Sequence, residues 1–355
     1  MSKQVESLTV DQIAQFKREG FLVLPGVLDS ELCRQARDEM WETIHEQLPR
    51  MKRDDPASWY HITEEESASL KAKRPDGGGD PYFGGSGHRC YIRNGAEELM
   101  LNLAPRALWN VAEQLLGEGT VVRPHGLDAS EIATGPCFMC DDAVGGLVSH
   151  VGHDMGFPTE GSFVTEELRL PKTGPVWLNG QGTRGLYCTL PKSPPPGPDY
   201  ASAHSDGACY GRFRLQMSAY IDDVSPNSGG FGVWPGSHSR IWTEQWKAFQ
   251  EGEKHTDKHL AVREAGGYAD PVIGQIKADT QPFDCHGSAG TVVLWHTKIL
   301  HIAGQNASDD VIRQATIYGF LKTRETLPDA LVTDNTNGDV WRDWSEEVQG
   351  IEDRE

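Results

Sequence analysis

The sequence of 355 residues has no run of about 18 apolar residues, the length that a membrane-spanning helix requires. It is also poor in positive charge: 33 Lys and Arg face 52 Asp and Glu, which gives a formal net charge of −19. An acidic surface repels the phosphates of nucleic acids and the anionic headgroups of membranes. We therefore expect neither a nucleic acid nor a membrane as a partner.

Cysteine is scarce as well, with seven residues scattered along the chain. An odd number of scattered cysteines favours free thiols over a disulfide framework. The pairs Cys137/Cys140 and His150/His153 lie close in the sequence, but their spacing differs from that of zinc fingers, and we predict no zinc there. The first residues also lack the apolar segment of a secretory signal, so a cytoplasmic location is expected.

Glycine, proline and tryptophan are plentiful, at 39, 21 and ten residues. This composition is typical of a mainly β protein with many turns and flanking helices. The sequence has no internal repeat and no linker with a shift in charge, so we expect a single domain over residues 1–355. Two loop-rich insertions, at about 50–90 and 125–200, are the candidates for a lid over a binding site.

The first 48 residues predict two helices with a strand between them. Thr9 and Gln12 form a capping box ahead of an apolar stripe, and Gly20 ends that helix. Asp29 or Ser30 caps the second helix. Further helices are expected over 96–117 and 240–262, and strands over 21–24, 119–124, 175–179, 185–190, 215–221, 231–234, 281–284, 290–295 and 313–320. The polar tail after Leu327 is expected to wrap the surface or fray.

The triplet His204-Ser205-Asp206 is the strongest candidate for a functional site. A strand places alternate side chains on one face, so His204 and Asp206 point the same way. Two histidines and one carboxylate can occupy one face of an octahedral Fe(II) and leave three positions open. His301, far downstream, is a candidate for the second histidine. Catalytic zinc accepts the same set of ligands and is the competing metal.

The order of four motifs resembles that of the phytanoyl-CoA dioxygenase-like family of Fe(II)/2-oxoglutarate oxygenases. Members of this family share a double-stranded β-helix, a jelly-roll or cupin-like core. The stretches that carry the resemblance are Leu8–Gly26, His204–Asp206, Ile221–His238 and Gly290–Arg313. The loop-rich residues 125–200 depart from the family pattern.

The resemblance implies that His204, Asp206 and His301 are the ligands of Fe(II). His296 is the rival of His301, but the family's His-x₄-His pattern puts the ligand second. Asp206 also disfavours halogenation, because related halogenases have a small residue in its place to admit chloride.

The resemblance further implies that Arg313 pairs with the distal carboxylate of 2-oxoglutarate. A guanidinium suits this role because it matches a carboxylate with two parallel hydrogen bonds. Gln216 falls where family members carry a polar residue that faces the cosubstrate, with Ser218 on the same strand face.

The function implied is a dioxygenase that hydroxylates an unactivated C–H of a small molecule with O₂ and releases succinate and CO₂. Desaturation and ring closure stay open as outcomes. A zinc hydrolase with the same three ligands is one alternative, although no His-Glu-x-x-His helix is present. A metal-free jelly-roll binding module is the other.

Overall fold

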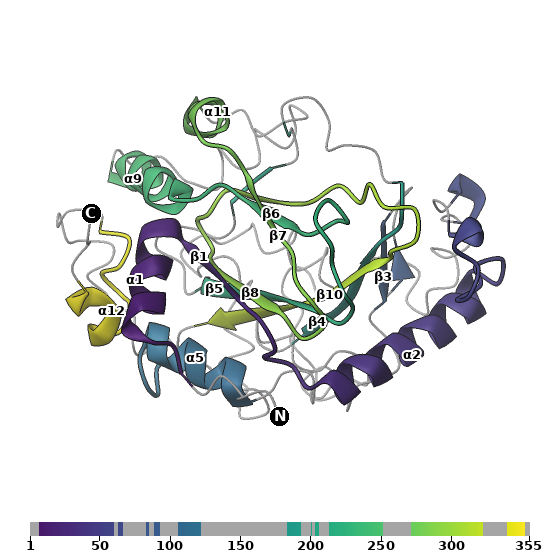
Figure 1. Ribbon diagram of the computed structural model, residues 1–355. Helices are drawn as coiled ribbons and strands as arrows, with labels where there is room; N and C mark the ends of the chain where they lie inside the picture. The colour runs from purple at the N-terminus through teal and green to yellow at the C-terminus, as the bar shows by residue number, and fades with distance from the viewer. Residues whose placement is uncertain are drawn as a thin grey trace, which may run out of the picture.

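The computed structural model describes the two sheets of the molecule and the helices that cover them. Its described residues form two antiparallel β-sheets that face each other (Figure 1). The predicted mainly β core with flanking helices, in the double-stranded β-helix class, is confirmed. The described residues are 7–59, 63–66, 83–84, 89–92, 106–121, 183–192, 200, 203–205, 213–250, 271–321 and 339–351.

The larger sheet has seven strands and the smaller sheet has three. In spatial order, the larger sheet consists of β1 (Phe21–Leu24), β8 (Val292–His296), β5 (Phe213–Tyr220), β10 (Arg313–Leu321), β4 (Thr183–Thr189), β3 (Arg89–Ile92) and β2 (Phe83–Gly84). The smaller sheet consists of β7 (Phe283–Cys285), β6 (Phe231–Val233) and β9 (His301–Ala303). The expected loop over 50–90 therefore includes β2 and the start of β3, which extend the larger sheet.

The two faces of the larger sheet differ because side chains alternate along each strand. On β5, Leu215 and Met217 belong to the main hydrophobic core under the helices. Tyr220 belongs to a second cluster, together with Phe231 and Val233 of the smaller sheet. The second cluster thus fills the space between the sheets, which we call the inner layer.

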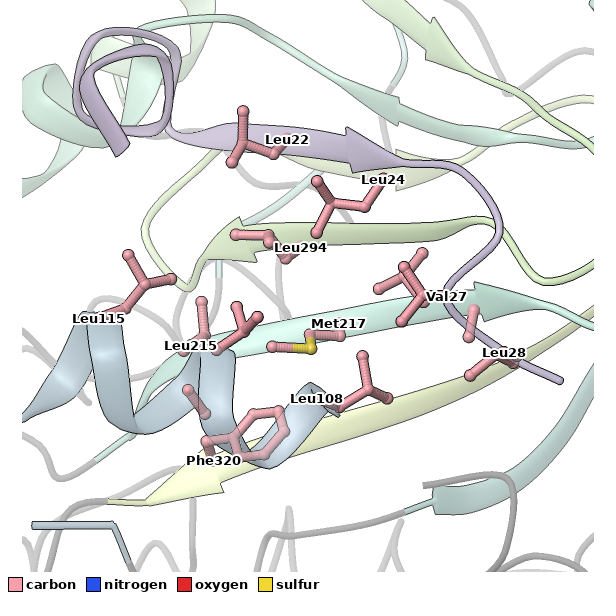
Figure 2. Packing of buried hydrophobic residues seen from close by; sticks show 14 of the residues in the cluster. Leu22, Leu24, Val27, Leu28, Leu108, Leu115, Leu215, Met217, Leu294 and Phe320 are labelled. Carbon is pink, nitrogen blue, oxygen red and sulfur yellow. The ribbon is translucent and has the colours of Figure 1, made fainter. Parts of the chain in front are cut away.

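Four helices cover the outer face of the larger sheet: α1 (Val10–Glu19), α2 (Ser30–Gln47), α5 (Arg106–Leu116) and α12 (Glu346–Gly350). Figure 2 shows Leu108 and Leu115 of α5 packed against Leu215 and Met217 of β5. The predicted starts of the first two helices are confirmed. Thr9 closes a capping box on α1, and Asp29 accepts hydrogen bonds from the first turn of α2.

Two further helices, α9 (Ser237–Gln250) and α11 (Pro271–Asp279), lie on the side of the smaller sheet (Figure 1). Ile241 of α9 and Ile273 and Ile276 of α11 pack with Ile302 of β9 in a third cluster. α9 begins at Ser237, three residues before the predicted start. α11 was not predicted, because its nine residues carry a short apolar stripe interrupted by Gly274.

The C-terminal segment corrects a sequence expectation. Trp341 and Trp344 are only 6% and 3% exposed and belong to the main core, with ring centroids 5.6 and 5.4 Å from that of Phe16. The described part of the tail is therefore anchored rather than frayed, because its two indoles bury a large apolar area.

Some expected features fall outside the residues that the structure describes. They are the first half of the helix over 96–117, the end of the helix over 240–262, the strand over 175–179, and the four Cys and His residues between 137 and 153. In the part of the chain that is described, no helix combines the length and the apolarity that crossing a membrane demands.

Candidate active site

His204 and His301 lie side by side on neighbouring extended segments. Their backbones form an antiparallel bridge, with His204 N–H donating to His301 O at 3.0 Å and His301 N–H donating to His204 O at 2.9 Å. Their ring centroids are 4.4 Å apart with an interplanar angle of 51°. The fold thus brings together two imidazoles that are far apart in the sequence.

The surroundings of His301 fix how its ring is oriented. Its Nδ1 lies 3.0 Å from the carbonyl oxygen of Ile299, which can only accept, so Nδ1 carries the proton. The lone pair is then on Nε2, the tautomer that a metal-binding histidine uses when a carbonyl orients its other nitrogen. The ring packs 5.1 Å from Phe231 and 5.9 Å from Trp295, between the two sheets.

His296, the rival of His301, points the opposite way. It ends β8 on the outer face, where its ring stacks on Trp344 at 5.1 Å and meets Trp341 edge-on at 5.3 Å. Its Nδ1 accepts a hydrogen bond from the backbone N–H of Lys298 at 3.0 Å. Burial holds the pKa of His296 well below its ordinary value, so the ring stays neutral. It is a packing residue of the helix layer.

Arg313 begins β10 and lies almost fully buried at the inner layer. Its register partner on β4 is Thr189, whose hydroxyl accepts a hydrogen bond from Arg313 Nη2 at 2.9 Å. Gly229 makes room for the arginine: it has φ +91°, and a Cβ there would lie 3.1 Å from Arg313 Cβ. The Asn-Ser-Gly-Gly turn is thus shaped to pack against this side chain.

Gln216 and Ser218 are buried, at 1% and 3% exposure, in the middle of the larger sheet. They alternate with Leu215 and Met217, which face the helices, so both share the inner face with Tyr220. Their register partners on β8 are Trp295 and Val293, two residues of the inner layer. Their place on the sheet agrees with the predicted orientation, while contact with a cosubstrate stays a prediction.

Asp206, the expected third ligand, lies outside the described residues. Among the residues that are described, no three His, Cys, Asp or Glu side chains come together as a metal site. The set of two histidines and one carboxylate therefore stays a prediction, and the structure shows only that two of its three residues lie side by side.

Tyr220 and Asn306 are two residues near the site whose contacts the sequence alone did not reveal. The Tyr220 hydroxyl donates to Cys285 O at 2.5 Å and accepts from Phe231 N–H at 2.9 Å, which ties the two sheets together. Burial raises the pKa of Tyr220 well above its usual range, so the hydroxyl keeps its proton. Asn306 Nδ2 donates to Thr189 O at 2.9 Å and so holds β4 beside the loop that leads to Arg313.

Comparison with known proteins places the chain among oxygenases. Residues 140–315, about half of the chain, match the family model of phytanoyl-CoA dioxygenase. No curated protein matches the sequence significantly.

Several solved structures are similar to this chain at low identity. SnoK, a non-heme α-ketoglutarate-dependent carbocyclase from nogalamycin biosynthesis, is 13% identical, with 90% of this chain and 86% of SnoK covered and a TM-score of 0.39. EctD from S. alaskensis with bound Fe is 13% identical, with 92% and 81% covered and a TM-score of 0.42. The epimerase SnoN in complex with Fe³⁺, α-ketoglutarate and nogalamycin RO is 15% identical, with 93% and 91% covered and a TM-score of 0.36.

Proposed function

Because the chain belongs to the phytanoyl-CoA dioxygenase family, we propose that it is an Fe(II)- and 2-oxoglutarate-dependent dioxygenase that hydroxylates a small molecule. The observation that carries the proposal is the pair His204 and His301, whose ring centroids are 4.4 Å apart beside the inner layer. Arg313 adds a buried guanidinium where the strands β4 and β10 meet.

The residues present suit an iron ion. His301 is held by Ile299 O in the tautomer that offers Nε2, and His204 is fixed to it through two backbone hydrogen bonds. Asp206 follows His204 by two residues and is proposed as the third ligand. Imidazole suits iron as well as zinc, and a triad with open positions is typical of non-heme Fe(II) oxygenases.

Arg313 is proposed to hold the distal carboxylate of 2-oxoglutarate. Thr189 accepts from Nη2 and so limits the rotation of the guanidinium, which favours a two-pronged pairing with a carboxylate. Gln216 and Ser218 are proposed to line the cosubstrate from the larger sheet.

The bound iron and 2-oxoglutarate would supply the oxidation of an unactivated C–H by O₂, with succinate and CO₂ as co-products. The chain contributes position and the exclusion of water. Phe231 and Trp295 pack at 4.2 Å beside His301 and provide an apolar wall. Asp206 would fill the coordination position that a halide needs, which favours hydroxylation over halogenation.

The test is anaerobic loading of the purified protein with Fe(II), followed by metal analysis and by measurement of succinate formed from 2-oxoglutarate in air. We expect one iron per chain and iron-dependent succinate. His301→Ala should abolish both. The matched control is His286→Ala, since His286 is 44% exposed and has no proposed part in the site. Tightly held zinc without succinate formation would refute the proposal in favour of a hydrolase, and the lack of any metal would favour a binding module.

The type of oxidation is tested by mass spectrometry of the product formed under ¹⁸O₂ in chloride buffer. Incorporation of one ¹⁸O is the expected result. A chlorinated product would contradict the role given to Asp206, and a product that lacks ¹⁸O would leave desaturation or ring closure.

A further inference from the structure

Tyr200, which lies four residues before His204, has an uncommon backbone conformation. Tyr200 has φ +52°, a left-handed conformation that costs energy for a residue with a Cβ. Its carbonyl oxygen accepts a hydrogen bond from Ala203 N–H at 2.9 Å, which links Tyr200 directly to the residue before His204. His204 follows immediately and pairs with His301. Ala203 is held by the Tyr200 carbonyl and is joined directly to His204, so the position of Tyr200 affects where the His204 side chain lies.

Two contacts from other parts of the fold hold Tyr200 in place. Lys277 of α11 donates from Nζ to the Tyr200 carbonyl oxygen at 2.8 Å. The Tyr200 ring meets the ring of Trp234 edge-on, with centroids 5.3 Å apart and an interplanar angle of 87°. Trp234 is fully buried and is itself fixed by its backbone N–H, which donates to Leu300 O at 3.0 Å.

The apolar face of α11 reinforces the same segment. Ala203 is fully buried in the cluster that contains Ile273 and Ile276 of α11 and Trp234. The residue before His204 is thus packed under the helix whose Lys277 holds the Tyr200 carbonyl. A side chain larger than alanine at this position would push the helix and the strand apart.

We propose that Lys277 and Tyr200 are positioning residues for His204, and that α11 acts through them to set the affinity of the site for its metal ion. The proposal rests on the proposed function, because it takes His204 as a metal ligand. Lys277 donates to the Tyr200 carbonyl oxygen, the same oxygen accepts from Ala203 N–H, and Ala203 is joined directly to His204. A shift of Tyr200 would change the position of His204, whereas Arg313 lies on β10 beside β4 and would stay in place.

The test compares Lys277→Met with Lys247→Met. Methionine keeps most of the aliphatic length but cannot donate a hydrogen bond. Lys247 of α9 is a suitable control, because it is 60% exposed and pairs with Glu244 at 2.7 Å on its own helix. The probes are Mn(II), titrated by electron paramagnetic resonance, and Co(II), followed by its visible absorption, both without cosubstrate.

We expect Lys277→Met to weaken Mn(II) binding about three- to ten-fold, less than the 10–100-fold typical for loss of a group that touches a metal ligand directly. The Co(II) absorption bands should shift, and the affinity for 2-oxoglutarate at saturating metal should stay within about two-fold, because Arg313 is not displaced. Lys247→Met should match the wild type in all three measurements. Tyr200→Ala, which removes the contact with Trp234, should weaken Mn(II) binding in the same way.

A purely structural role would lower the melting temperature of Lys277→Met and leave the metal affinity and the Co(II) spectrum unchanged well below that temperature. That result would overturn the proposal. If instead the wild type bound no Mn(II), or if His301→Ala bound Mn(II) as well as the wild type, the proposed function itself would fail. The two failures are therefore distinguishable.

Discussion

The buried ion pair between Arg214 and Asp343 is expected to be the strongest single polar anchor of the C-terminal segment. Arg214 Nη2 lies 2.7 Å from Asp343 Oδ2, and the two side chains are only 1% and 3% exposed. The guanidinium also lies 5.4 Å over the ring of Trp242. The pair joins the start of β5, two residues before Gln216, to the segment that carries Trp341.

Asp343→Asn keeps the volume of the side chain but takes away the carboxylate that faces Arg214. Removing one partner of a buried pair costs about 3–5 kcal/mol, because the other charge stays in a medium that solvates it poorly. Domains are stable by only about 5–15 kcal/mol, so this is a large part of the total. We therefore expect Asp343→Asn to lower the free energy of unfolding by about 3–5 kcal/mol.

The matched control is the pair Arg240 and Asp279, which has the same chemistry in water. Its two hydrogen bonds, 2.7 and 2.9 Å long, are about as short as the bond between Arg214 and Asp343, but its side chains are 35% and 55% exposed. Asp279→Asn should cost no more than about 1 kcal/mol, since solvent screens an exposed pair.

Urea unfolding followed by tryptophan fluorescence measures both variants under the same conditions. The double variant Arg214→Met/Asp343→Leu should recover most of the loss, because neither position then leaves an unpaired charge in the core. The reasoning is refuted if Asp343→Asn unfolds at the same urea concentration as Asp279→Asn, or if the double variant is less stable than Asp343→Asn.

Three further predictions concern a glycine, the cosubstrate and pH. Gly20→Ala should lower the melting temperature more than Gly119→Ala does. Both glycines have positive φ, but a Cβ at Gly20 would lie 2.4 Å from His238 Nδ1, whereas a Cβ at Gly119 would meet open space. Arg313→Lys should weaken 2-oxoglutarate binding about ten-fold or more in a titration while iron binding survives. Lysine keeps the positive charge but cannot donate two parallel hydrogen bonds to a carboxylate. Burial lowers the pKa of His238 to about 4 from 6.5, so the unfolded chain takes up a proton first as the pH falls. As the pH falls from 6.5 to 4, the contribution of His238 to the free energy of unfolding should thus decrease by about 1.4 kcal/mol per pH unit. The free energy of unfolding of His238→Asn, measured with urea, should depend less steeply on pH over this range.

Local signals in the sequence were sufficient for the elements that depend on neighbours in the chain. The capping box of Thr9 and Gln12 and the left-handed Gly20 define α1 without help from the rest of the fold. The alternation along β5 correctly separates Gln216 from Leu215, because period-two burial is written in the residues themselves.

Features that depend on distant contacts were harder to predict. α11 has only three buried apolar residues, and what holds it is the cluster around Trp234 rather than its own periodicity. Trp341 and Trp344 lie among charged residues that suggested a surface tail, yet they pack on Phe16. The pairing of His204 with His301 has no local signal either, and the family motifs supplied that expectation.

The two histidines at the end of β8 and the start of β9 show why a short motif identifies a site only through the fold. His296 is the last residue of β8 on its outer face, and the chain then crosses to the smaller sheet within four residues. Thr297 N–H donates to Arg214 O at 3.0 Å at one end of this crossing, and Leu300 N–H donates to Ser237 Oγ at 2.8 Å at the other. Because both ends are fixed, the crossing cannot slip by one residue, and a slip would exchange the faces of the residues that follow. His301 therefore lies between the sheets beside His204 while His296 lies under the helices, and the choice between them is made by the hydrogen bonds of the crossing.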